Sequence, residues 1–150
     1  MIWLDDLEIG AETYFGSTEV TREEVIAFAQ RYDPQPFHLS DEAAARTHFG
    51  RLAASGWHTC AMVMGVIARH VVETEQAGLG SPGIDELRWL KPVYPGDTLH
   101  VHARIIDVTP SRSKPEIGSF RSATTVTNQD GVPVLTFTSI VLMRRKPAEG

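Results

Sequence analysis

The hydrophobic and polar residues of this chain change their spacing along the sequence. Up to about residue 75, apolar residues recur every three or four positions, which is typical of amphipathic helices. The segments 98–108, 120–127 and 134–143 instead alternate apolar and polar residues, as strands with one buried face do. Helices followed by a run of antiparallel strands predict a domain of the α+β class.

Three helices are expected in the first half of the chain. The run Thr21-Arg22-Glu23-Glu24 fits a capping box, and helical spacing continues to Tyr32. Asp33 precedes a proline and is therefore disfavoured in a helix, so the first helix should end there. A serine cap and an acidic first turn predict a short helix over about 40–47. The longest helix, over about 56–75, is apolar around most of its circumference, which predicts that other elements wrap it.

Two further segments, 84–90 and 13–20, have the composition of strands. Turn residues occur at Pro95-Gly96-Asp97, which suits a type II turn, and at Asn128-Gln129-Asp130-Gly131. About five strands beside one long helix predict a curved sheet wrapped around that helix. A single sheet of this kind has an exposed edge, so we expect two chains to pair as a homodimer, with a higher homo-oligomer as the alternative.

Composition narrows the functional classes. With 150 residues, 42% of them hydrophobic, the chain should form a single domain, 1–150, with its core between about residues 5 and 145. The net charge of −5 comes from dispersed acidic residues, which argues against nucleic acid as a partner. A single cysteine, Cys60, excludes an intrachain disulfide and suits a reducing compartment. Neither a signal peptide nor an apolar run of roughly 20 residues is visible, so we expect a cytoplasmic protein with no membrane partner.

Candidate chemistry begins with Asp33 and His38, which lie on a short segment stiffened by two prolines. Each proline fixes its own φ and restricts the residue before it, so positioning these two groups costs less entropy. A carboxylate and an imidazole held together can transfer protons. An Asp before Pro is also typical of a turn, and a histidine on a loop is commonly solvated. Residue types alone leave both interpretations open.

The head of the long helix, Ser55-Gly56-Trp57, is the second candidate. Ser is a favoured N-cap, and the free N–H of Gly56, joined by that of Trp57, would face an anion or a polarised oxygen at the positive end of the helix. Glycine there has no Cβ to obstruct a substrate. An ordinary helix cap explains the same residues. His58, one residue on, either supports the site or packs in the core.

Together these segments resemble the MaoC-like dehydratase family, whose members include the (R)-specific enoyl-CoA hydratases. The family's Asp and His, with four residues between them, stand here as Asp33-Pro34-Gln35-Pro36-Phe37-His38. The likeness continues through Ala54-Ser55-Gly56-Trp57-His58-Thr59 and the segment 87–97, and it covers about residues 5–145. It implies the hot-dog fold, in which a sheet wraps one central helix. Ser55 stands where many family hydratases have a histidine, which leaves the acyl substrate open.

The resemblance implies a lyase of fatty acid metabolism that adds water reversibly to a trans-2-enoyl-CoA or acyl-carrier-protein thioester. Asp33 and His38 would activate water, in roles that stay open, and the Gly56 N–H, with Ser55 and Trp57, would bind the thioester oxygen. Candidates to support the pair from behind are Pro34, Phe37 and His58. No metal and no cofactor are expected, coenzyme A entering only as part of the substrate. A thioesterase and a non-catalytic acyl-thioester binding module remain alternatives on the same fold.

Three smaller expectations accompany this hypothesis. Arg112 and Lys114, in a polar loop, would either contact the phosphates of coenzyme A or form a solvated hairpin tip, and Arg51, Arg88 and Lys91 are weaker candidates of that kind. His100 and His102 share a strand face, but no further ligand completes a metal set. Finally, Asp33 follows the C-terminal end of a helix, whose dipole should raise the pKa of its carboxyl.

Overall fold

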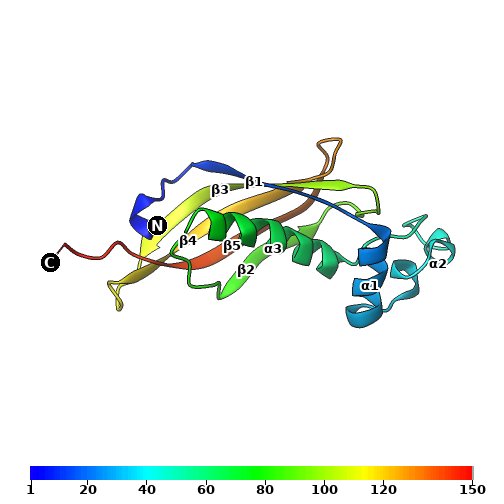
Figure 1. Ribbon diagram of the computed structural model, residues 1–150, viewed down its shortest axis with the longest axis horizontal. Helices are drawn as coiled ribbons and strands as arrows, with labels where there is room; N and C mark the ends of the chain where they lie inside the picture. Colours follow the sequence, from blue (N-terminus) through cyan, green and yellow to red (C-terminus); the bar gives the residue numbers. More distant parts are fainter. Residues whose placement is uncertain (150) are drawn as a thin grey trace.

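The computed structural model describes residues 1–149, which form a five-stranded antiparallel sheet with one long helix across one face (Figure 1). The strands are β1 (Glu12–Glu19), β2 (Gly83–Trp89), β3 (Thr98–Pro110), β4 (Ile117–Thr127) and β5 (Pro133–Arg144), in the order β1-β3-β4-β5-β2. The helices are α1 (Arg22–Tyr32), α2 (Asp41–Ala45) and α3 (Gly56–Glu73), with 3-10 turns at Leu4–Asp6 and Pro36–His38. The α+β prediction is confirmed.

The main core lies between α3 and the sheet. Val63 and Val66 of α3 are buried against Leu99 and Val101, the inward-facing residues of β3. Burying a side chain of this size contributes about 1.5–3 kcal/mol, so this layer fixes α3 on the sheet. A smaller cluster, including Met143, lies at the end of the sheet where the two termini meet (Figure 1).

Local capping sets where the helices begin. The Thr21 hydroxyl accepts a hydrogen bond from the Glu24 N–H (3.3 Å), and α1 ends at Tyr32 as expected. α2 ends at Ala45, earlier than the expected Thr47, because the last turn tightens and the Thr47 side chain donates to the Ala44 carbonyl (2.7 Å). Both α1 and α2 lie at one end of the sheet, beside the first turn of α3 (Figure 1).

The sequence predicted that other elements would wrap α3, but within one chain the sheet covers only one side of it. Met64 and Val72, on the uncovered side, are 56% and 74% exposed. On the sheet edge nearby, Ile84 of β2 is 53% exposed, and β2 pairs with β5 alone. The apolar circumference of α3 therefore exceeds what a single chain can bury.

A β-bulge in β2 decides which side chains face α3. Three steps along β2, from Asp85 to Arg88, oppose two steps along β5, and Glu86 adopts a φ of +57°. One extra residue reverses the alternation of inward and outward side chains. As a result Leu87 packs in the core and Trp89 reaches the first turn of α3.

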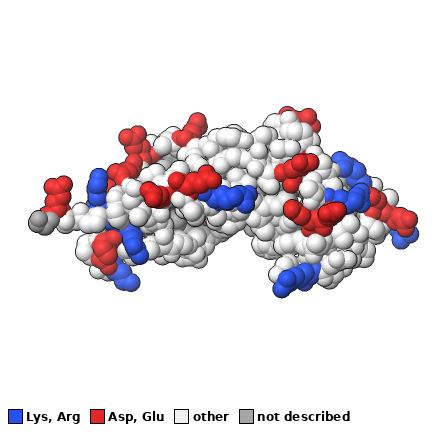
Figure 2. Space-filling model, in the orientation of Figure 1, with Lys and Arg blue, Asp and Glu red and all other residues white. Residues whose placement is uncertain are grey.

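Charged side chains of both signs are scattered over the face shown in Figure 2. This face offers no continuous basic surface of the kind that binds nucleic acid. Within residues 1–149, no helix is both long and apolar enough to cross a bilayer.

Candidate active site

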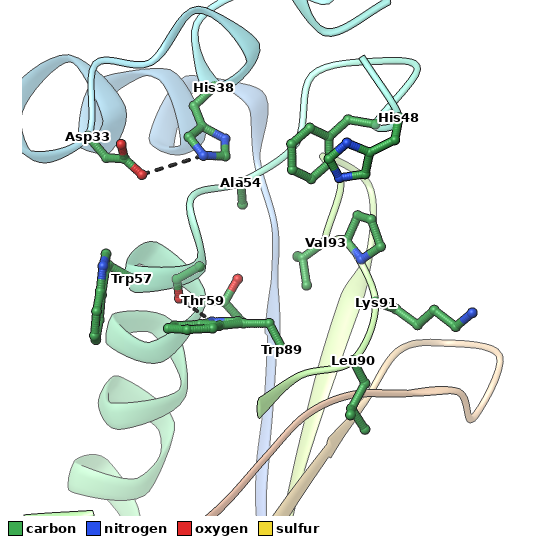
Figure 3. A pocket seen from close by; sticks show the side chains of 13 residues that line it. Asp33, His38, His48, Ala54, Trp57, Thr59, Trp89, Leu90, Lys91 and Val93 are labelled. Carbon is green, nitrogen blue, oxygen red and sulfur yellow. Dashed lines mark hydrogen bonds and ion pairs between the residues drawn. The ribbon is translucent and has the colours of Figure 1, made fainter. Parts of the chain in front are cut away.

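A cavity of about 490 Å³ opens where the α1–α2 loop meets the head of α3 (Figure 3). Its lining residues are Asp33, His38, His48, Phe49, Ala54, Gly56, Trp57, Thr59, Trp89, Leu90, Lys91, Pro92 and Val93. The structure therefore brings both halves of the predicted site to one cavity, although they are separate in sequence.

Asp33 and His38 form the polar centre of this cavity. The His38 Nε2 and an oxygen of Asp33, Oδ2, are 3.4 Å apart, and the two side chains are 6% and 17% exposed. The other ring nitrogen of His38, Nδ1, lies 2.8 Å from the Ala53 carbonyl oxygen. A carbonyl can only accept, so Nδ1 carries a hydrogen. Nε2 therefore holds the lone pair when the ring is neutral, and a protonated ring pairs with the Asp33 carboxylate through Nε2.

Both oxygens of Asp33 accept further hydrogen bonds. The Gln35 amide donates to Oδ1 and the Ser55 hydroxyl to Oδ2, each at 2.7 Å. Partial burial raises the pKa of Asp33, but the hydrogen bonds from Gln35 and Ser55, with the charge of His38, outweigh it and hold the pKa below its ordinary value. The prediction of a more basic Asp33 at the helix end is wrong in direction, because these local donors dominate.

Ser55 caps α3 as the sequence predicted and makes a second contact that the sequence did not reveal. Its side chain is fully buried, donates to Asp33 and accepts from the Trp57 N–H at 3.3 Å. Ser55 therefore caps α3 and positions the Asp33 carboxylate. The same bond occupies the Trp57 N–H, which removes it as a second oxyanion donor.

Gly56 remains the candidate N–H donor to a thioester oxygen, and the structure shows why this residue is a glycine. Its N–H has no acceptor among residues 1–149, and it lines the cavity. A Cβ at this position would lie 2.7 Å from ring atoms of Trp89, so the side-chain space of residue 56 is filled by the indole. Glycine is required here for close packing of Trp89 rather than for substrate approach along that side.

Trp89 is the main lining residue that sequence reasoning missed. Its indole N–H donates to the Gly56 carbonyl at 2.9 Å, and its ring meets Trp57 edge-to-face with centroids 5.2 Å apart. The sequence did contain one signal for this placement. Trp89 ends a strand two positions after Leu87, and residues two apart in a strand share a face. The bulge in β2 obscured which face Trp89 would take.

Comparisons with known proteins identify the family of this chain. The family model described as the MaoC like domain matches residues 7–128. This chain belongs to the MaoC-like dehydratase family. It is 38% identical to a MaoC-like dehydratase from Rhodospirillum rubrum, with a TM-score of 0.87 over 99% of this chain and 100% of that one. It is also 31% identical to a 3-hydroxybutyryl-CoA dehydratase from Methylorubrum extorquens over 76% of this chain and 70% of that protein.

The fold prediction is confirmed as well. A Mycobacterium tuberculosis protein with a double hot-dog fold aligns with a TM-score of 0.80 over 99% of this chain and 46% of its own length. At 16% identity that likeness concerns the fold alone. The five-stranded sheet with α3 across one face is thus a hot-dog fold.

Three residues that the family likeness suggested as supports differ in their surroundings. Phe37 packs edge-on against His38, with centroids 4.6 Å apart, and so supports the imidazole directly. Pro34 is exposed in the loop and acts through the backbone alone. His58 is buried outside the cavity lining and stacks on Phe28 at 4.7 Å, and its Nδ1 has no hydrogen-bond partner among the described residues. Burial lowers the pKa of His58, opposed by the charge of Glu24.

Of the residues considered as contacts for the phosphates of coenzyme A, some lie near the cavity and others lie far from it. Arg112 and Lys114 lie in the β3–β4 hairpin at the end of the sheet opposite α1 and α2 (Figure 1). The 13 residues of β3, about 40 Å of strand, separate them from the cavity, so they do not reach a thioester held in the same chain. Lys91 does line the cavity, whereas Arg51 stacks over the Tyr94 ring at 3.8 Å.

The remaining candidates lie outside the cavity lining. His100 and His102 are on the outer face of β3, where the Tyr14 hydroxyl is 2.8 Å from the His100 ring. Within residues 1–149 no three side chains of metal-ligating type come together. Burial raises the pKa of the Cys60 thiol, opposed by a hydrogen bond from Trp89, as expected of a packed cysteine.

Proposed function

We propose that this protein hydrates 2-enoyl thioesters, or dehydrates 3-hydroxyacyl thioesters, at the Asp33/His38 cavity. The observation that supports this most directly is the convergence of three groups on one space: a carboxylate, an imidazole lone pair and the unpartnered Gly56 N–H. Membership of a dehydratase family and the 3-hydroxybutyryl-CoA dehydratase relative point to the same reaction.

The hydrogen bonds suggest how the two side chains divide the work. A lowered pKa makes the Asp33 carboxylate a poor proton acceptor, so its part is to hold the water and to stabilise a charged imidazole. His38 Nε2 then removes the proton as the water oxygen bonds to C3. The electrons of the C2–C3 double bond move to the thioester oxygen, and the imidazolium returns its proton to C2.

The Gly56 N–H would stabilise the charge on the thioester oxygen in this scheme. It lies at the first residue of α3, where the helix dipole is positive. A single oxyanion donor is worth about 2.7–4 kcal/mol in well-studied enzymes. Because the donor is a backbone group, its role is tested through the geometry around Gly56 rather than by deleting a side chain.

Incubation with crotonyl-CoA tests the proposal. Hydration yields a product heavier by one water with its thioester intact, which mass spectrometry resolves. Asp33→Asn and His38→Ala should each lower kcat by about 10²–10⁴. Release of free coenzyme A thiol without the hydrated product would instead indicate a thioesterase. Tight binding of thioesters with no turnover would indicate a binding module, and activity surviving both substitutions would refute the assignment.

We also propose that two chains pair through the edge of β2 and the uncovered side of α3. Met64, Val72 and Ile84 are more than half exposed there, and an unpaired edge strand with apolar neighbours favours association. Sedimentation should give the mass of a dimer, and Ile84→Lys should convert it to a monomer. The equivalent change on the outer face, Thr125→Lys, is the control and should leave the mass unchanged.

A further inference from the structure

The cavity has two chemically different ends. Lys91 points outward on one side, whereas Trp57 and Trp89 lie on the other side, below Asp33 and His38 (Figure 3). A thioester carries its phosphates at one end and its acyl group at the other. The charged end suits the side of Lys91, so an acyl group whose reacting carbons lie beside Asp33 and His38 extends towards the indoles.

Trp89 is held as a fixed wall at that end. Its N–H is bonded to the Gly56 carbonyl, its ring fills the space where residue 56 lacks a Cβ, and Trp57 meets it edge-on. Any rotation of the indole would break the hydrogen bond and both packing contacts. The bulge at Glu86 aims the side chain at α3, and bulges beside active sites commonly re-aim a side chain in this way.

Behind this wall lies Cys60, one helical turn beyond Gly56. The Trp89 indole lies close enough to the Cys60 thiol to oppose the rise in its pKa that burial causes, so the two side chains are neighbours. Cys60 is half-buried and is the one cysteine of the chain. Removing the indole would therefore extend the cavity towards Cys60, along the side of α3.

We propose that Trp89 ends the acyl pocket and restricts this protein to thioesters of short acyl chains. The inference rests on the proposed function for the orientation of the thioester. The wall itself is independent of which reaction follows. On this proposal the space between the catalytic pair and the indole takes a crotonyl group, whereas each further methylene must find space that Trp89 occupies. In an apolar pocket a single misplaced methylene changes kcat/KM by about 10-fold to 200-fold.

The first test compares hydration of enoyl-CoA substrates from four to ten carbons. Wild type should prefer crotonyl-CoA to octenoyl-CoA by at least about tenfold in kcat/KM, and Trp89→Ala should abolish or reverse that preference. Trp89→Leu and Trp89→Phe should give graded, smaller shifts, and they remain informative where the alanine variant folds poorly. Trp3→Leu, at the far end of the sheet, is the matched control and should leave the preference unchanged.

Two outcomes would refute the proposal that Trp89 ends the acyl pocket. One is a wild type that hydrates octenoyl-CoA as efficiently as crotonyl-CoA. The other is a Trp89 series in which all chain lengths lose activity in the same proportion, since that result means that Trp89 only supports the fold.

The second test does not depend on turnover. Cys60 should react faster with a thiol reagent in Trp89→Ala than in wild type. Saturated decanoyl-CoA, which cannot be hydrated, should protect Cys60 in the variant, whereas butyryl-CoA should not. Equal protection by both would contradict the proposal. If no enoyl thioester is hydrated but decanoyl-CoA protects Cys60 better than butyryl-CoA does, the proposed reaction is refuted. The proposal that Trp89 ends the acyl pocket is then still supported.

Discussion

Asp33 and His38 reach the cavity from the loop between α1 and α2, whereas Trp57 and Trp89 reach it from the head of α3 and the end of β2. The first pair, the polar wall, is largely buried, and hydrogen bonds hold both its members. The second pair, the indole wall, is 60% and 44% exposed and is held mainly by ring packing.

This difference separates two properties of the site. The polar wall depends on where its hydrogens lie: the hydrogen bonds to Asp33 favour the carboxylate, and the Ala53 carbonyl selects the tautomer of His38. The indole wall needs only volume and shape, which packing supplies. We therefore expect changes in the polar wall to alter the rate for every substrate alike, and changes in the indole wall to alter the choice among substrates.

Asp33→Asn should have the largest effect, because it removes the carboxylate while keeping its shape. We expect kcat to fall by about 10²–10⁴ for every acyl length, measured with the same series of enoyl-CoA substrates. Asp107→Asn, on the exposed face of β3, is the control and should be neutral. A loss that varied with chain length would contradict the separation between the two walls.

Gly56→Ala should destabilise the fold, because the new Cβ would lie 2.7 Å from the Trp89 ring. Overpacking of this kind costs about 1–3 kcal/mol in free energy of unfolding, measurable by urea denaturation. Gly65→Ala, whose Cβ would meet only the Arg69 side chain at 3.4 Å, is the control on the same helix and should not destabilise. In a Trp89→Leu background the cost should shrink. Equal costs in both backgrounds would refute the contact as the cause.

Ser55→Ala removes the hydroxyl that donates to Asp33. The pKa of Asp33 should move up towards its ordinary value, followed by NMR of its carboxyl carbon, and kcat should fall by roughly tenfold. Ser40→Ala, which removes the cap of α2, serves as the control. It should lower stability by about 1 kcal/mol while leaving the Asp33 titration unchanged. An identical titration in the Ser55 variant would show that Ser55 acts only as a cap.

His58→Phe should have the smallest effect, confined to mildly acidic solution. The pKa of His58 is lowered below 6.5, so the unfolded chain binds a proton before the folded protein does. Its stability contribution is therefore complete above pH 6.5 and is lost as the pH falls towards the folded pKa. Phenylalanine keeps the stack on Phe28 and should flatten this part of the stability curve. A curve of unchanged slope would mean that another group titrates there.

Much of the architecture could be predicted from local patterns. The strands, the Thr21 cap, the end of α1 before Pro34 and the type II turn at Gly96, with a φ of +96°, all follow from interactions between near neighbours in sequence. The pairing of Asp33 with His38 was also visible, because both lie on one short, stiff loop. These features need no knowledge of the rest of the chain.

The errors share a different origin. The Ser55 hydroxyl, 22 residues away, joins the nearby Gln35 amide in lowering the pKa of Asp33. The need for glycine at position 56 comes from Trp89, 33 residues away. Arg112 and Lys114 were candidates by composition, and the length of β3 places them at the other end of the molecule. Each of these three properties depends on contacts or distances that are fixed only when the sheet and α3 have packed.

The sequence by itself determined the elements, the family and the two residues that we propose transfer protons, because periodicity, capping and a short motif act over a few residues. Only the tertiary structure decided what those residues can do. It fixed the tautomer of His38 through the Ala53 carbonyl and assigned Ser55 to Asp33. A single extra residue in β2 turned Trp89 inward, and the limit that we infer for the acyl chain follows from that placement.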